Sequence, residues 1–186
     1  MDWVEYFAIG SMMNPVSLNM RGLNPIKSRP GILKNYELIF VMAHGMAAAR
    51  LCDSSNIHGV LHRVSKAELD VLNKSESTYV IGKKVNIGLY RNEDLQNWPE
   101  DVKEKERLNQ AGFASVEQSM IKNVDAIVYV LNDQIVLKDP ERFAVNPPSE
   151  RYIDILKGGA LHYGLNVIKI KFSLYFCVQY LPFQLE

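Results

Sequence analysis

A strand that runs directly into a Gly-Ser turn and then a helix start constrains the fold of this chain most. Val4 to Ile9 is short, apolar and aromatic, as expected for a buried strand, and Gly10-Ser11 ends it. Asn14 and Pro15 follow with the signature of a helix N-cap and first helical position. Successive N–H groups at such a turn form an anion or oxyanion site, although most junctions of this kind are ordinary turns.

A second segment, NPPSERYIDILKGGALHYGL at residues 146–165, predicts a helix near the other end of the chain. Ser149 is the expected N-cap of a helix from about Glu150 to Tyr163, and Gly164 is the expected residue just past its C-terminus. Side chains with helical spacing should form its buried face: Tyr152, Leu156, Ala160 and Tyr163.

The residues between these segments predict strands and one capped helix. Ser65 and Glu68 form a capping box in front of a helix over about residues 66–74. Residues 47–55 and most of 93–122 have loop character. Strands are expected at residues 33–42, 58–64, 79–91 and 125–131. This mixture predicts an α+β fold, with a small, mostly antiparallel sheet or barrel and helices packed outside it.

Composition narrows the class of protein. A chain of 186 residues with 47% apolar residues suits one domain with a substantial core. Its 21 basic and 21 acidic residues balance, which argues against nucleic-acid binding. Without a basic leader or a run of about 20 apolar residues, no membrane partner is expected and the predicted location is cytoplasmic. The distant Cys52 and Cys177 favour a reduced protein and leave a disulfide open.

Glu76 is the candidate acid/base. It follows the capped helix and precedes a strand, so a cavity at a barrel mouth would bury its carboxylate and raise its pKa toward neutrality. A solvated loop glutamate is the commoner alternative. His58 and His62 share one face of a strand, but no third ligand has suitable spacing, so no metal site is expected. Phosphate-binding loops and nucleophile elbows are both missing from the sequence.

In this order, the segments resemble the γ-glutamylcyclotransferase family. Its opening strand ends in Tyr-Gly-Ser-Asn-(Leu/Met), and YFAIGSMM lies on that motif. Its middle motif, a strand, a helix and Leu-Asp-x-x-Glu, is similar to HGVLHRV, SKAELDVL and Asn73 to Glu76. Its late Pro-Ser-x-x-Tyr and Gly-Ala-x-x-x-Gly-Leu motif is matched by PPSERYIDILKGGALHYGL. The resemblance covers about residues 6–165.

The resemblance implies a γ-glutamylcyclotransferase-like fold, a small mixed or antiparallel β-barrel with flanking helices. It predicts a single domain at residues 1–165 and an atypical C-terminal extension at residues 166–186. The implied reaction, part of glutathione metabolism, releases 5-oxoproline from a small γ-glutamyl amino acid or amine. The substrate's own α-amine attacks its γ-carbonyl, so the family needs no cofactor.

The resemblance also assigns site residues. Glu76 maps onto the family's general acid/base, which takes the α-ammonium proton and returns it to the departing nitrogen. Tyr79 is similar to a pocket tyrosine that lies further along the chain in many members. The substrate-binding backbone N–H groups of the opening turn map onto four residues: Ile9, Gly10, Ser11 and Met12.

Several positions depart from the family pattern. Ile9 replaces the opening tyrosine, Met12 replaces an asparagine, Asn73 replaces an aspartate, and Ser77 replaces a frequent glycine. These changes motivate an alternative, a catalytically impaired member that binds a small ligand. A third possibility is an interaction scaffold that uses the apolar C-terminal residues. Both a monomer and a homodimer remain open.

Overall fold

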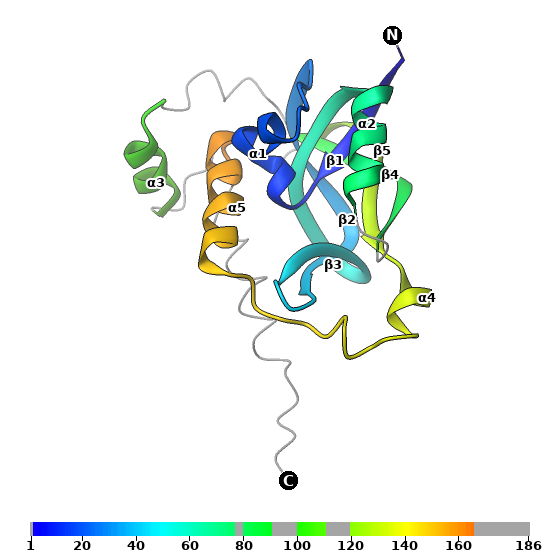
Figure 1. Cartoon of the computed structure of the whole chain (residues 1–186). Coiled ribbons are helices and arrows are strands. Elements are labelled where there is room, and N and C mark those ends of the chain that lie inside the picture. The colour runs from blue at the N-terminus through cyan, green and yellow to red at the C-terminus, as the bar shows by residue number, and fades with distance from the viewer. Residues whose placement is uncertain (1, 77–79, 91–99, 111–119, 166–186) are drawn as a thin grey trace.

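The computed structural model describes residues 2–76, 80–90, 100–110 and 120–165. Five strands close into a barrel in the order β1-β3-β2-β4-β5, and the helices lie outside it (Figure 1). The strands are β1 (Trp3–Ala8), β2 (Lys27–Val41), β3 (Met46–Ser65), β4 (Val80–Tyr90) and β5 (Met120–Leu131). The helices are η1 (Ser11–Met13), α1 (Pro15–Met20), α2 (Lys66–Ser75), α3 (Val102–Gln110), α4 (Asp133–Val136) and α5 (Glu150–His162).

Neighbouring strands are antiparallel except where β5 meets β1 and β3 in parallel. The α+β barrel with flanking helices that the sequence predicts is therefore confirmed. No helix among the described residues has the length and apolar character needed to span a bilayer. The predicted extension at residues 166–186 and the predicted site residue Tyr79 lie outside the described residues.

Local signals placed the helix ends correctly. Asn14 caps α1 by accepting a hydrogen bond from the Val16 N–H at 2.9 Å. Ser65 and Glu68 form both bonds of the capping box. Ser149 accepts from the Tyr152 N–H at 3.3 Å, and Gly164 has a positive φ of 62°. Each of these signals acts over a few residues, so no distant partner is needed for it to form.

The prediction of a loop at residues 47–55 was wrong, because β3 begins at Met46. Its first residues pair with β2 from Val41↔Met46 to Tyr36↔Leu51, and the register then passes to Lys34↔Asn56. Asn35 on β2 therefore lies opposite four residues of β3, which form a large bulge. The polar Asp-Ser-Ser run belongs to this bulge alone. Three consecutive alanines before it have low β-propensity, which hid the strand.

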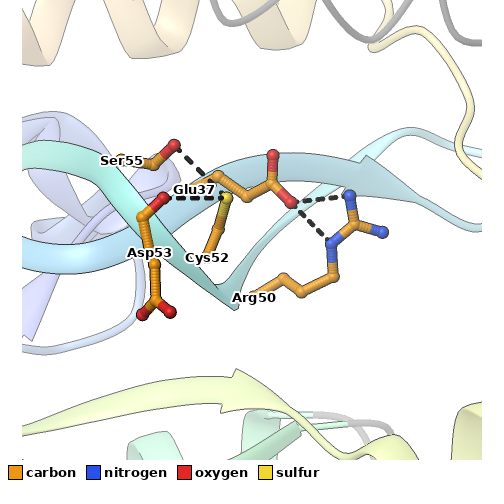
Figure 2. Close-up of polar contacts among 5 residues, drawn as sticks. All are labelled: Glu37, Arg50, Cys52, Asp53 and Ser55. Atoms are coloured by element: carbon orange, nitrogen blue, oxygen red, sulfur yellow. Dashed lines mark hydrogen bonds and ion pairs between the residues drawn. The ribbon is translucent and has the colours of Figure 1, made fainter.

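Figure 2 shows the polar contacts around this bulge. The Glu37 carboxylate on β2 accepts from Nε of Arg50 on β3 at 2.8 Å and from its Nη2 at 2.7 Å. The Ser55 hydroxyl donates to Sγ of Cys52 at 3.4 Å. Cys52 is a free thiol among the described residues. Cys177 lies outside them, so the structure does not test the predicted reduced state of this pair.

Helix α5 packs against the opening turn η1, so the two ends of the described domain meet (Figure 1). A Cβ added at Gly159 would lie 2.8 Å from the carbonyl carbon of Met13, which only glycine avoids. The Asn14 side chain also donates to the Ile155 carbonyl at 3.0 Å. Of the side chains predicted to face inward, Leu156 and Ala160 are at 0% exposure and Tyr163 is buried, whereas Tyr152 is half-buried.

The β2–β3 turn is braced by the segment that leads into α5. Gly45 has φ +59°, and an added Cβ there would lie 2.5 Å from Cα of Pro148. The Asn146 N–H donates to the Phe40 carbonyl at 2.9 Å, next to an isolated bridge between Val41 and Val145. The late segment therefore holds both the opening turn and the β2–β3 turn.

Candidate functional site

A cavity of about 200 Å³ lies where β1 leaves the barrel for η1, and we call it the turn cavity. It is lined by the end of β1, by η1, by the β2–β3 turn, by the start of β4 and by side chains from β5 and α5. Arg21, the C-cap of α1, and Glu76, the C-cap of α2, add one charge of each sign. Several elements thus converge on one concave site, as in most small-molecule sites.

Glu76 lies at the point where the chain turns out of α2. Its N–H closes the helix by donating to the Leu72 carbonyl at 2.8 Å, and its backbone is extended at φ −70° and ψ 135°. Burial raises the pKa of its carboxyl, and the positive charge of Arg21 opposes that rise. A carboxylate with a raised pKa is suited to exchanging protons near neutrality.

The Gly-Ser turn lines the same cavity. The N–H groups of Met13 and Asn14 bond to the carbonyls of Gly10 and Ser11 at 3.0 Å, closing the short helix η1. The N–H groups at the start of η1 come before these bonds in the chain, where the N–H groups of any helix have no partner within the helix. A Cβ at Gly10 would lie 3.0 Å from Oη of Tyr152, so glycine leaves room for that hydroxyl.

The substituted residues of the opening turn are buried apolar side chains. Ile9 is 7% exposed and Met12 is 4% exposed, and both line the turn cavity as members of the main core. The turn cavity therefore brings together five of the six predicted site residues: Ile9, Gly10, Ser11, Met12 and Glu76. Their roles stay predictions.

Three tyrosines complete the cavity, and the sequence reasoning did not assign them to it. Tyr6 packs edge-on against Tyr129, with ring centroids 5.8 Å apart. Burial, with the charge of Glu76 as a further cause, raises the pKa of both phenols well above the usual range. Burial also raises the pKa of Tyr152, whose oxygen accepts from the Ala47 N–H at 3.4 Å. All three hydroxyls therefore stay protonated and can donate hydrogen bonds.

Asn73, one of the departures from the family pattern, has a clear partner. Its Oδ1 accepts a hydrogen bond from the Tyr129 hydroxyl at 2.7 Å. This bond joins the last turn of α2 to β5 beside Glu76. The apolar run at residues 125–131 predicts the strand that carries Tyr129, but only the barrel shows which side chains Tyr129 contacts.

His62, on β3, braces the opening turn. It is fully buried, its Nε2 lies 3.1 Å from the Met12 carbonyl, and its Nδ1 lies 2.8 Å from the Ser28 hydroxyl. Because a carbonyl only accepts, Nε2 carries the proton and Nδ1 accepts from Ser28. Burial lowers the pKa of His62 to about 4, so the imidazole is neutral near pH 7.

The two strand histidines have separate partners. His58 Nδ1 lies 3.2 Å from the Tyr90 hydroxyl, whereas His62 bonds to Ser28 and to the Met12 carbonyl. Among the described residues, no group of three His, Cys, Asp or Glu side chains is placed to hold a metal ion.

Comparison with known proteins supports the fold. No protein-family model matches the chain, and no curated protein matches it by sequence. A γ-glutamyl cyclotransferase structure matches with a TM-score of 0.63 at 16% identity, over 92% of this chain and 86% of that one. An uncharacterised Homo sapiens protein matches with a TM-score of 0.63 at 17% identity, over 93% and 87%.

YkqA from Bacillus subtilis matches with a TM-score of 0.61 at 18% identity, over 94% of this chain and 55% of that one. These identities speak to architecture alone. The chain resembles the γ-glutamyl cyclotransferases in structure over more than nine-tenths of its length and has their fold.

Proposed function

We propose that the chain is a γ-glutamyl cyclotransferase that releases 5-oxoproline from a small γ-glutamyl amino acid or amine. The observation that carries this proposal is the position of Glu76. Its carboxyl lies in the same cavity as the Gly10-Ser11 turn and has a pKa raised by burial. A fold shared with γ-glutamyl cyclotransferases supports the same reaction class.

The reaction needs one acid/base and no outside reactant. The Glu76 carboxylate removes a proton from the substrate's α-ammonium, and the freed amine attacks the γ-carbonyl carbon. The resulting oxyanion is stabilised by N–H groups of the opening turn and by neighbouring tyrosine hydroxyls. Glu76 then returns its proton to the departing nitrogen as the C–N bond breaks. The ring nitrogen gives its remaining extra proton to Glu76, which passes it to the released amine. The products are 5-oxoproline and the ammonium form of the amine, so atoms and charges balance.

The expected contributions can be ranked. A positioned acid/base gives about 10²–10⁴ in rate. Ring closure is already intramolecular, so the cavity adds mainly by holding the γ-glutamyl chain curled toward attack. The raised pKa of Glu76 predicts that activity falls with acidification, because the protonated carboxyl cannot accept the ammonium proton.

A second candidate is a binding module that has lost catalysis. The buried Ile9 and Met12 favour it, since the family carries a hydroxyl and an amide there. Backbone donors do not depend on those side chains, and three tyrosine hydroxyls remain around the cavity. A poised carboxylate would bring little to a site that only binds, so we favour the enzyme.

The test is release of 5-oxoproline from a panel of γ-glutamyl amino acids and amines. Glu76→Gln keeps the shape of the side chain but cannot accept a proton, and turnover should fall by about 10²–10⁴. Asp70→Asn is the matched control, because it neutralises an exposed carboxylate on the same helix. Full turnover in Glu76→Gln would remove Glu76 from the mechanism. A folded wild type that binds these compounds without turnover would favour the binding module.

A further inference from the structure

Arg21 is the only basic side chain among the described residues that line the turn cavity. It is exposed at the C-terminal end of α1, and its Nη1 donates to the Ser75 hydroxyl at 3.3 Å. Ser75 in turn donates to the Leu72 carbonyl at 2.9 Å. The guanidinium is therefore fixed beside the residue that immediately precedes Glu76.

The Arg21 guanidinium affects the electrostatics of the turn cavity without forming an ion pair with Glu76. Burial raises the pKa of Glu76, and the charge of Arg21 opposes that rise; as a smaller cause it also opposes the burial-driven rise in the pKa of Tyr6 and Tyr152. The ion pairs among the described residues join other arginines and lysines to carboxylates, and none joins Arg21 to Glu76 within 4 Å. A guanidinium has five N–H donors in a planar fork, so one bond to Ser75 leaves donors for a ligand.

A γ-glutamyl group matches this pair of charges. Its α-carbon carries an ammonium and a carboxylate, and the cavity presents Glu76 and Arg21 from the ends of two adjacent helices. Guanidinium is well suited to holding a carboxylate through two parallel hydrogen bonds. Binding the carboxylate at Arg21 would bring the neighbouring ammonium to Glu76.

We infer that Arg21 binds the α-carboxylate of the γ-glutamyl group and so selects substrates in which that carboxylate is free. This inference rests on the proposed function and adds to it a residue that determines specificity. Compounds amidated at the α-carboxyl, or lacking it, should be poor substrates even though their α-amine and γ-amide are intact. The leaving amine needs no carboxylate of its own.

γ-Glutamylethylamide separates the two carboxylates that Arg21 could bind, because its leaving group carries no carboxylate. Arg21→Met should raise KM for this substrate about ten- to hundredfold and change kcat less, since a charge-assisted bidentate contact is lost. Arg21→Lys should recover part of the loss. The analogue 4-amino-N-ethylbutanamide lacks the carboxylate and should be used equally poorly by wild type and Arg21→Met.

Two controls separate binding from a structural role. Arg63→Met removes an exposed guanidinium that joins β3 to Glu5 on β1, and it should leave KM unchanged. Ser75→Ala removes the anchor of Arg21 but keeps its charge, so it should raise KM less than Arg21→Met. Equal losses of Arg21→Met on both ethylamides would show that Arg21 only supports the fold and would overturn the inference. An Arg21 effect confined to substrates whose leaving group carries a carboxylate would also overturn it.

A binding experiment separates this inference from the proposed function. 5-Oxoproline carries the carboxylate, and 2-pyrrolidinone is the same ring without it. Wild type should bind 5-oxoproline more tightly than Arg21→Met does, and the two proteins should bind 2-pyrrolidinone alike, as measured by calorimetric titration. That binding pattern without any turnover would contradict the proposed function but support the carboxylate site at Arg21. Turnover with an unchanged KM in Arg21→Met would keep the proposed function and overturn the carboxylate site. Absence of both binding and turnover would overturn the function and the carboxylate site together.

Discussion

Two cavities among the described residues differ in size and in chemistry. The turn cavity holds about 200 Å³, whereas a second, which we call the strand cavity, holds about 540 Å³. The strand cavity is lined by exposed apolar side chains such as Leu51 and Ile81, and Lys83 lies over the Tyr36 ring at 5.8 Å. The smaller cavity contains Glu76 and tyrosines with shifted pKa values. Convergent polar groups, rather than volume, identify the site.

The difference follows from how each cavity is built. β2 pairs with β4 only from Gly31↔Leu89 to Leu33↔Ile87, and the strand cavity lies between residues further along these two strands. It is lined mainly by strand residues, from β2, β3, β4 and β5, together with the start of α4. The turn cavity is formed where capped helix ends, a glycine turn and α5 meet, so its side chains are held from several directions.

Acid should expose the largest difference between the two regions. The pKa of His62 is lowered from 6.5 to about 4, so the unfolded chain binds its proton first as pH falls. The contribution of His62 to the free energy of unfolding is therefore fully present above pH 6.5. It is lost as the pH falls toward 4, a decrease on the order of 3 kcal/mol. Denaturant unfolding at pH 7.5, 5.5 and 4.5 measures the decline.

His62→Gln is the matched variant for the acid experiment. Its amide can still donate to the Met12 carbonyl and does not titrate, so the pH dependence should become flatter. An equally steep decline in His62→Gln would show that other groups cause the acid sensitivity. As the pH falls, the opening turn should unfold first. Binding of 5-oxoproline should therefore be lost at a higher pH than the one at which Tyr36, at the strand cavity, changes environment.

Removing one hydroxyl from each cavity should have unequal effects on activity. Tyr152→Phe removes an oxygen that contacts the Ala47 N–H and lies over Gly10, and kcat/KM should fall about tenfold, the usual scale of one hydrogen bond. Tyr36→Phe at the strand cavity should leave kcat/KM unchanged. A larger loss in Tyr36→Phe would reverse the assignment of the two cavities.

The smallest expected effect concerns the helix caps beside the two cavities. Ser149→Ala should destabilise the domain by about 1 kcal/mol, because Ser149 caps α5, which carries Tyr152. Asn132→Ala removes a similar cap from the four-residue α4 at the strand cavity and should cost less, since so short a helix supports little packing. Thermal unfolding of both variants checks this order, and equal shifts would contradict it.

The sequence predicted the parts of the fold that depend on neighbours in the chain. The caps Asn14, Ser65 and Ser149 are local, and the structure confirms them. The first half of β3 was missed because its pairing depends on the distant β2 and on the brace between Gly45 and Pro148. Residues 46–51 carry no strong strand signal of their own.

The same distinction applies to the candidate site. Glu76 and the opening turn belong to motifs, so the sequence identified them. Arg21, Tyr129 and His62 lie on three different elements, and only closure of the barrel brings them to the turn. The register Tyr6↔His62 between β1 and β3 is one such long-range fact that periodicity cannot supply.

The docking of α5 on the opening turn has a consequence for biosynthesis. The Asn14 side chain donates a hydrogen bond to the Ile155 carbonyl, although 141 positions separate the two residues in sequence. Contacts of such long range form late, since a large loop must close first. During translation, the buried Met12 and Met13 have no α5 to cover them until the last part of the domain leaves the ribosome. We therefore expect the opening segment to be a binding target for chaperones in the nascent chain, and the turn cavity to be completed last.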